Sequence, residues 1–199
     1  MSHSPNTRWH VAHLTRDERW SALGSRGATV WLTGLSGAGK STIGTALEHD
    51  LVELGSPAYM LDGDNLRLGL NNNLGFSADD RAENVRRVGE VARLFADAGM
   101  ISIVTLISPY RAGRDYARRI HHEAGLPFFE VWVATSLDEC ERRDTKGLYA
   151  RARAGEITDL TGVGSPYEPP ERAEIKIVTE VQTVKMAVST ITSVLRERA

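Results

Sequence analysis

Residues 34–41 read Gly-Leu-Ser-Gly-Ala-Gly-Lys-Ser and match the phosphate-binding pattern G-x-x-x-x-G-K-[ST]. A short apolar, β-branched stretch at 28–32 precedes them, and a helical pattern at 41–54 follows and stops at Gly55. In such a strand–loop–helix unit the glycines let backbone N–H groups surround phosphates, and the helix N-terminus adds a positive dipole. The segment therefore predicts a nucleoside triphosphate site at the start of an α/β fold.

Predicted strands and helices alternate along the rest of the chain. The strands are expected at 28–32, 58–61, 101–107, 128–133 and 175–178, and the helices at 41–54, 79–98, 111–123 and 181–196. Alternation of this kind predicts a parallel sheet with helices on both faces. We expect an α/β fold of three layers, similar to P-loop nucleoside triphosphate hydrolases, with a five-stranded parallel sheet and a lid.

Composition narrows the class of protein. The 199 residues fit a single domain over 1–199, and 24 Lys and Arg against 26 Asp and Glu exclude the basic balance of a general nucleic-acid binder. A lone cysteine, Cys140, excludes an internal disulfide and a cysteine-based zinc site. No apolar run could span a bilayer, and no signal-peptide pattern opens the chain. We expect a cytoplasmic protein with neither nucleic acid nor membrane as a partner.

Residues 144–170 interrupt the alternation. They hold glycines, prolines and charges without a sustained apolar period. Connections of this length inside a compact domain are usually lids or binding loops, so we interpret the segment as a mobile lid. The alternative is a disordered surface insertion, which several apolar residues disfavour: Leu148, Tyr149, Ile157, Leu160 and Tyr167.

The phosphate-binding loop also predicts roles for two side chains. Lys40 is expected to reach the β- and γ-phosphates, and the Ser41 hydroxyl to ligate magnesium. These features leave a signalling GTPase, a motor-like ATPase and a small-molecule kinase open. The chain has no guanine-specific Asn-Lys-x-Asp segment, which disfavours the GTPase. ATP and Mg²⁺ are therefore the expected cofactors.

Two carboxylates, Asp62 and Asp64, follow the predicted strand at 58–61. The carboxyl ends of parallel strands face the crevice in which ligands bind. Asp64 is our candidate both for the base that accepts a hydroxyl proton and for a magnesium ligand, with Asp62 as a supporting residue. The alternative is an ordinary Asp-Gly turn, which the phosphate-binding loop upstream disfavours.

A basic stretch follows these carboxylates. Arg67 lies three residues after Asp64, and further polar residues open the next helix: Arg81, Asn84, Arg86 and Arg87. The planar guanidinium fork binds phosphate or sulfate oxygens in pairs, so an anionic substrate is expected. For Arg86 and Arg87 a solvated helix face is an equal alternative. Phe76, in a polar loop, fits either stacking on a substrate base or core packing.

Six ordered motifs together resemble the adenylylsulfate kinase (APS kinase) family. They are GLSGAGKST at 34–42, DGDNLR at 62–67, LGFSADDRAENVRR at 74–87, ISPYR at 107–111, KGLYARARAGE at 146–156 and GSPYEPP at 164–170. The resemblance covers nearly the whole chain, and residues 1–26 resemble the family's amino-terminal lead-in. It implies transfer of the ATP γ-phosphoryl group to the 3′-hydroxyl of adenosine 5′-phosphosulfate (APS), giving PAPS and ADP in sulfate activation and assimilation.

The resemblance also implies site residues. The residues implied to bind ATP are Gly34, Leu35, Ser36, Gly37, Ala38, Gly39, Lys40, Ser41 and Thr42, with Arg143 packed on the ATP adenine. The residues implied to bind APS are Asp64, Arg67, Phe76, Arg81, Asn84, Ile107, Ser108 and Lys146. Phe76 would stack on one face of the APS adenine, and Leu160 would cover the other face of that adenine. The catalytic residues are Lys40, Asp64 and Ser108, and the metal ligands Ser41 and Asp64. A homodimer is implied, as is association or fusion with ATP sulfurylase.

Ser108 and Leu160 each raise a question within this family. Ser108 matches a serine described as a phosphoserine intermediate in bacterial members, yet transfer between bound substrates needs positioning and charge neutralisation more than a covalent relay, so we expect direct transfer. The family usually has Gly-Phe where this chain has Asp159-Leu160. Loss of an aromatic pair costs roughly 0.5–1.5 kcal/mol, up to about tenfold in affinity, so weaker APS binding is expected.

Two other functions stay open at this level. One is a related small-molecule kinase that acts on a nucleoside, gluconate or shikimate. The other is a catalytically silent sulfonucleotide sensor tied to the sulfurylase, which the intact Lys40, Ser41 and Asp64 disfavour.

Overall fold

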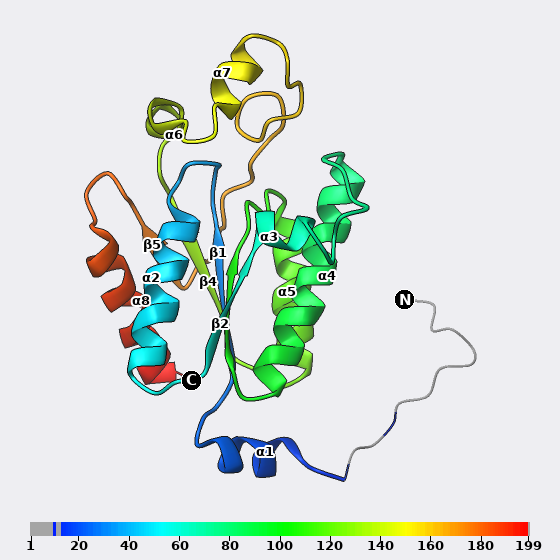
Figure 1. The fold of residues 1–199 in the computed structure, drawn as a ribbon, viewed down its shortest axis with the longest axis vertical. Helices are drawn as coiled ribbons and strands as arrows, with labels where there is room; N and C mark the ends of the chain where they lie inside the picture. The colour runs from blue at the N-terminus through cyan, green and yellow to red at the C-terminus, as the bar shows by residue number, and fades with distance from the viewer. Residues whose placement is uncertain (1–9, 11–12, 199) are drawn as a thin grey trace.

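A five-stranded parallel sheet lies at the centre of the computed structural model, which describes residues 10 and 13–198 (Figure 1). Its strands are β1 (Ala28–Thr33), β2 (Ala58–Asp62), β3 (Ile101–Thr105), β4 (Phe128–Val133) and β5 (Ile175–Ile177). The order across the sheet is β2-β3-β1-β4-β5, and every neighbouring pair is parallel. The predicted α/β fold is confirmed, although β3 ends at Thr105 rather than at residue 107.

Helices cover both faces of this sheet. On one face lie α2 (Lys40–Glu53) and α8 (Val184–Arg198), and on the other α4 (Ala78–Asp97) and α5 (Arg111–Glu123) (Figure 1). Every residue of β1 is buried. Val30 and Leu32 pack with the α2 side chains, whereas Trp31 packs with those of α4, because successive residues of a strand point to opposite faces. The central strand is therefore buried on both faces, as its sequence predicts.

The lead-in contains a helix that sequence patterns did not predict, α1 (Arg16–Leu23). Thr15 and Glu18 form a capping box at its start. Arg16 and Arg19 form ion pairs with Asp97 at the end of α4. These contacts hold α1 below the end of the sheet remote from α6 and α7 (Figure 1). Residues 1–9 and 11–12 of the lead-in lie outside the described residues.

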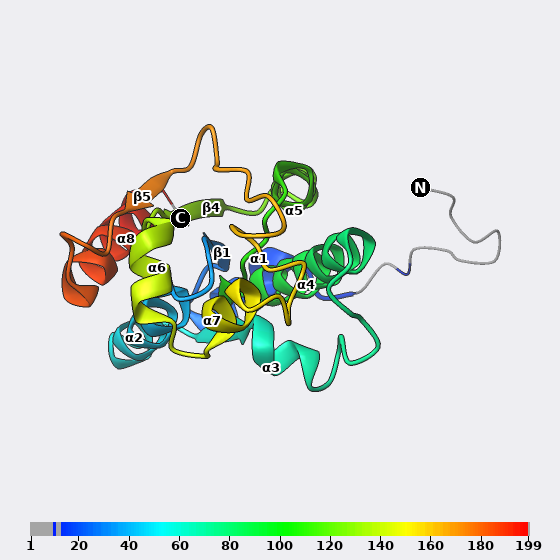
Figure 2. The same ribbon diagram turned by 90° about the horizontal axis from the view of Figure 1, so that it is seen from above.

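Beyond β4 the chain rises above the carboxyl edge of the sheet as α6 (Leu137–Arg143) and α7 (Leu148–Arg153). Figure 2 shows α7 over this edge, between α2 and α4 in projection. The expectation that 144–170 lacks regular structure is wrong here, because the Asp144 carboxylate accepts the N–H groups of Tyr149 and Ala150 and starts α7. Mobility of this lid stays a prediction.

Over the part of the chain that the structure describes, no helix is long and apolar enough to cross a bilayer.

Candidate active site

The phosphate-binding loop lies between β1 and α2, as its sequence predicts. Gly37 and Gly39 have φ angles of 75° and 103°, in the region that favours glycine. A Cβ atom on Gly37 would lie 3.2 Å from the Cys140 carbonyl oxygen, so a side chain would also be crowded there. Glycine at these positions lets the backbone wrap tightly onto the first turn of α2.

Lys40 is buried at the start of α2, with 8% of its surface exposed. Its Nζ donates to the carbonyl oxygens of Gly34 at 2.9 Å and Leu35 at 2.7 Å. Burial lowers the pKa of the ammonium group to about 8. An ammonium group has three N–H donors, so the loop carbonyls leave one for a phosphate oxygen.

The Asp62 carboxylate, at the end of β2, connects the first turn of α2 with the end of β3. The Ser41 hydroxyl donates to Asp62 Oδ2 at 2.8 Å, and the Thr105 hydroxyl donates to the same oxygen at 2.7 Å. Burial raises the pKa of the Asp62 carboxyl, but the hydrogen bonds from Thr105, Ser41 and the backbone outweigh it and leave this pKa lowered. An ionised carboxylate beside a hydroxyl gives two oxygen ligands of the kind that Mg²⁺ prefers.

Asp64 occupies a different position from Asp62. It lies in the short helix α3 (Gly63–Arg67), and its side chain is 70% exposed. Its carboxylate forms an ion pair with the Lys146 ammonium group, which comes from the lid. The structure thus brings Asp64 together with Lys146 and brings Asp62, not Asp64, to Ser41.

Phe76 and Arg67 form an open platform beyond α3. The Arg67 guanidinium centre lies 4.3 Å from the centroid of the Phe76 ring, and Arg67 Nη1 donates to the carbonyl oxygens of Leu74 and Gly75. Phe76 is 63% exposed, so the core-packing alternative is wrong. The Arg67 guanidinium lies over this ring, and the remainder of the ring faces outward at the surface of the site.

Arg81 and Asn84 are buried at the start of α4. Arg81 donates to the Phe76 carbonyl oxygen at 2.7 Å, and also to the Thr161 hydroxyl and the Asp159 carbonyl oxygen in the lid. It therefore links the Phe76 loop to the lid. Asn84 Oδ1 accepts a hydrogen bond from Asn71 Nδ2 at 2.9 Å.

Arg86 and Arg87 lie one turn further along α4 and do not join this group. Both donate to the carboxylate of Glu83 on the same helix. Arg86 is exposed, as the solvated-face interpretation expects, whereas Arg87 is half-buried and also donates to the Leu70 carbonyl oxygen and to Asn73 Oδ1.

Ser108 follows β3 with a φ angle of 40°, which is unusual for a residue with a side chain. It is buried, and its hydroxyl oxygen accepts a hydrogen bond from Trp31 Nε1 at 3.1 Å. The neighbouring Ile107 is half-buried, and its carbonyl oxygen accepts a bond from Thr33 Oγ1 at 2.7 Å.

Arg143 and Leu160 frame the lid side of the site. Arg143 Nη1 donates to the Gly37 carbonyl oxygen at 3.3 Å, which sets it against the phosphate-binding loop. Leu160 is 7% exposed and packs in the same buried cluster as Leu35 and Tyr149. Their roles beside an adenine ring stay predictions.

Sequence patterns missed two residues that support the site. The buried Tyr149 donates its hydroxyl to the Ser36 carbonyl oxygen at 2.9 Å and so fastens α7 to the phosphate-binding loop. Arg114 on α5 donates to the Ser108 carbonyl oxygen at 2.7 Å. Neither has a local signal of such a role, because each partner lies on another segment.

The phosphate-binding loop lies between the central strand and α2, and the lid lies over the same edge of the parallel sheet. This arrangement is that of a P-loop nucleotide-binding phosphotransferase. The family model described as adenylylsulphate kinase matches residues 26–178. The chain belongs to the adenylylsulphate kinase family.

Curated relatives extend this similarity to the whole chain. The adenylyl-sulfate kinase of Staphylococcus haemolyticus is 49% identical over 198 residues, which cover 100% of this chain and 98% of the relative. That of Saccharomyces cerevisiae is 52% identical over 180 residues, 90% of this chain and 89% of the relative. Among solved structures, the Mycobacterium tuberculosis APS kinase in complex with AMPPNP and APS is 50% identical with a TM-score of 0.84, covering 86% of this chain and 99% of that one.

Proposed function

We propose that this protein transfers the γ-phosphoryl group of ATP to the 3′-hydroxyl of adenosine 5′-phosphosulfate, giving PAPS and ADP in sulfate activation and assimilation. One observation carries the proposal: the phosphate-binding loop, the Asp64–Lys146 pair and the Arg67–Phe76 platform all lie at one edge of the sheet, in a chain that belongs to this family. A triphosphate donor and an aromatic, anionic acceptor can meet there.

On the donor side, residues 34–42 bind ATP. The loop N–H groups and the buried Lys40 ammonium stabilise negative charge on the phosphates. Ser41 and Asp62 would hold a magnesium ion, which when bound would neutralise negative charge on the phosphates. The Ser41–Asp62 contact leads us to assign the metal to this pair rather than to Ser41 and Asp64. Arg143 packs on the ATP adenine.

On the acceptor side, Phe76 stacks on the APS adenine, and the forks of Arg67 and Arg81 bind its phosphate and sulfate oxygens. Asp64 accepts the proton of the 3′-hydroxyl as the phosphoryl group arrives. Lys146, already paired with Asp64, neutralises charge between the two substrates. Further acceptor contacts come from Asn84, Ile107, Ser108 and Leu160.

Transfer is direct in this proposal. Ser108 is 3% exposed and its hydroxyl oxygen accepts a hydrogen bond from Trp31, which restricts the approach of this hydroxyl to a γ-phosphate. Positioning the two substrates in line supplies most of the catalysis that such a reaction needs.

Three further proposals accompany this activity: a cytoplasmic location, a homodimer, and association with ATP sulfurylase. Light scattering of the purified protein, alone and mixed with the sulfurylase, tests the last two. A mass of 21.9 kDa for the particle would contradict the dimer.

ADP release tests the activity itself. APS is compared as acceptor with a nucleoside, gluconate and shikimate, each with ATP and Mg²⁺, and PAPS is identified by chromatography. Lys40→Ala is the control, because it removes charge neutralisation from the phosphate site and should abolish transfer while the fold remains. ADP release with another acceptor and none with APS would contradict the proposal, as would near-normal kcat in folded Lys40→Ala.

A further inference from the structure

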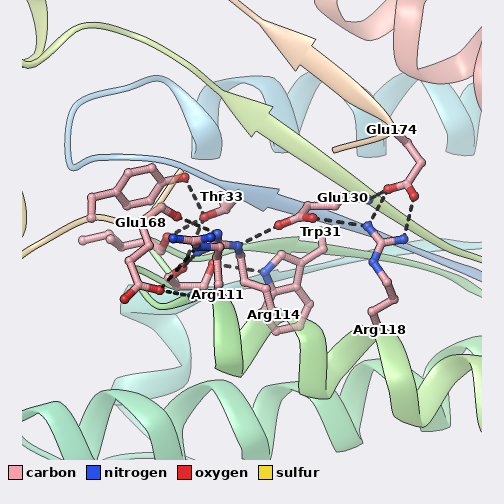
Figure 3. Close-up of polar contacts among 11 residues, drawn as sticks. Trp31, Thr33, Arg111, Arg114, Arg118, Glu130, Glu168 and Glu174 are labelled. Carbon is pink, nitrogen blue, oxygen red and sulfur yellow. Dashed lines mark hydrogen bonds and ion pairs between the residues drawn. The ribbon is translucent and has the colours of Figure 1, made fainter. Parts of the chain in front are cut away.

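Arg114 is a buried arginine on α5 whose guanidinium group contacts three separate segments (Figure 3). Only 2% of its surface is exposed. Its Nε donates to Glu130 Oε1 on β4 at 2.7 Å, its Nη1 to the Ser108 carbonyl oxygen at 2.7 Å, and its Nη2 to the Glu168 carbonyl oxygen at 2.6 Å. One rigid fork thus fixes a strand, the loop after β3 and the segment by which the chain returns from the lid.

The loop after β3 needs such a contact. Ser108 has a positive φ of 40°, a conformation that persists only when its surroundings hold it. Arg114 Nη1 donates to the carbonyl oxygen of this residue, and Thr33 Oγ1 donates to the carbonyl oxygen of the preceding residue, Ile107. The backbone conformation of Ser108 is therefore held by hydrogen bonds from two other elements, α5 and β1.

The return segment is fastened to the same loop. The Glu168 N–H donates to the Pro109 carbonyl oxygen at 2.8 Å, and the Arg111 N–H donates to Glu168 Oε2 at 2.8 Å. One residue earlier, the Tyr167 hydroxyl lies 3.0 Å from Thr33 Oγ1. Residues 107–109 and 167–168 therefore form one unit, and the Arg114 fork bridges its two halves.

The charges around Arg114 are balanced. Glu130 also accepts a bond from Arg118 Nη2 at 3.2 Å, and Arg118 pairs with Glu174 (Figure 3). A buried ion pair contributes little to stability beyond what apolar residues of similar volume would supply. Stability alone therefore does not account for the two hydrogen bonds that Arg114 donates to the carbonyl oxygens of Ser108 and Glu168, on the acceptor side of the site.

We propose that Arg114 is a positioning residue for the phosphoryl acceptor: it holds the 107–109 loop and the lid's return segment in one fixed arrangement. The inference rests on the proposed function, in which Ile107 and Ser108 contact APS. Arg114 contacts no residue of the 34–42 loop among its hydrogen bonds, so its effect falls on the acceptor and not on ATP.

The first test is Arg114→Lys, which keeps the buried charge opposite Glu130 but cannot reach both carbonyls at once. The KM for APS should rise about tenfold or more, since a charged hydrogen bond is lost, while the KM for ATP stays within twofold. Glu130→Gln is the matched control. It gives up the contact with Arg118 but keeps an acceptor for Arg114 Nε and both carbonyl contacts, so both KM values should stay within twofold.

A second variant separates positioning from stability. Arg114→Met combined with Glu130→Leu removes both members of the pair and should fold with a similar Tm, yet keep the raised KM for APS. It also serves if Arg114→Lys fails to fold. An APS KM within twofold of the unaltered protein in either folded variant, or equal rises in both KM values, would overturn the proposal.

Amide hydrogen exchange gives a readout without turnover. The Glu168 amide should exchange at least tenfold faster in Arg114→Lys and at an unchanged rate in Glu130→Gln, because only the first loses the bridge. Unchanged exchange in Arg114→Lys would contradict the inference. Failure of the proposed function looks different: the unaltered protein itself would release no ADP with APS.

Discussion

The Ser41 hydroxyl donates to Asp62 Oδ2 across 2.8 Å, which joins the first turn of α2 to the end of β2. Asp64, two residues later, faces away toward Lys146. The two carboxylates of the Asp-Gly-Asp sequence therefore face different parts of the site, and their conservative variants should fail in different ways.

Asp62→Asn should raise the magnesium concentration needed for half-maximal activity by about tenfold or more, because the ionised oxygen beside Ser41 is lost. Asp64→Asn should instead lower kcat by at least ~10²-fold at saturating magnesium, with a modest change in KM, since it removes proton acceptance. Titrating MgCl₂ against initial rate in both variants distinguishes them. A kcat defect confined to Asp62→Asn would reverse the two roles.

Ser108→Ala should keep measurable activity and form no phosphoenzyme. If transfer is direct, the hydroxyl only orients the acceptor loop through its bond from Trp31. Incubation with γ-labelled ATP without acceptor, followed by denaturation and mass analysis, measures the phosphoenzyme in the variant and in the unaltered protein. A phosphoserine at residue 108 that forms and decays as fast as turnover would refute direct transfer.

Leu160→Phe restores the aromatic residue usual in the family and should tighten APS binding by up to about tenfold. Phe76→Ala should weaken it by more than that, because no second ring remains to compensate. Stacking acts on ground and transition states alike, so KM should change more than kcat. Leu160 is buried in the lid, so Tm is measured alongside to detect overpacking. Unchanged APS affinity in a stable Leu160→Phe protein would mean that this position does not cover the adenine.

His121 makes the stability of the fold depend on pH. Its imidazole is fully buried and lies 2.7 Å from the Ala117 carbonyl oxygen and 2.8 Å from Thr29 Oγ1, so Nδ1 donates and Nε2 accepts in the neutral ring. Burial lowers its pKa from 6.5 to about 4. The unfolded chain therefore binds more protons between these values.

The free energy of unfolding should accordingly fall as pH falls from about 6.5 to about 4, by about 3 kcal/mol in total from this group. Urea unfolding across this range measures it. His121→Gln should flatten the slope, whereas His122→Gln, at an exposed position on the same helix, should leave it unchanged. An identical slope in His121→Gln and the unaltered protein would contradict the assignment.

The sequence by itself determined the features that depend on neighbouring residues. The β-branched stretch before Gly34, the glycine-rich loop and the amphipathic helices all follow from local pattern, which is why the parallel sheet and the position of Lys40 and Ser41 were predictable. The lead-in helix α1 was missed because its eight residues bury no side chain and are held by a capping box and by ion pairs with Asp97.

The tertiary structure alone decided which side chains meet. It set Asp62 rather than Asp64 beside Ser41, turned Arg86 and Arg87 onto Glu83, and aimed Arg114 at Ser108 and the lid's return segment. Both carboxylates follow the same strand and both are chemically suited to a metal. They differ because Asp62 ends β2 beside Thr105 of β3, whereas Asp64 belongs to α3. The packing of segments that are distant in the sequence sets the direction in which each carboxylate points.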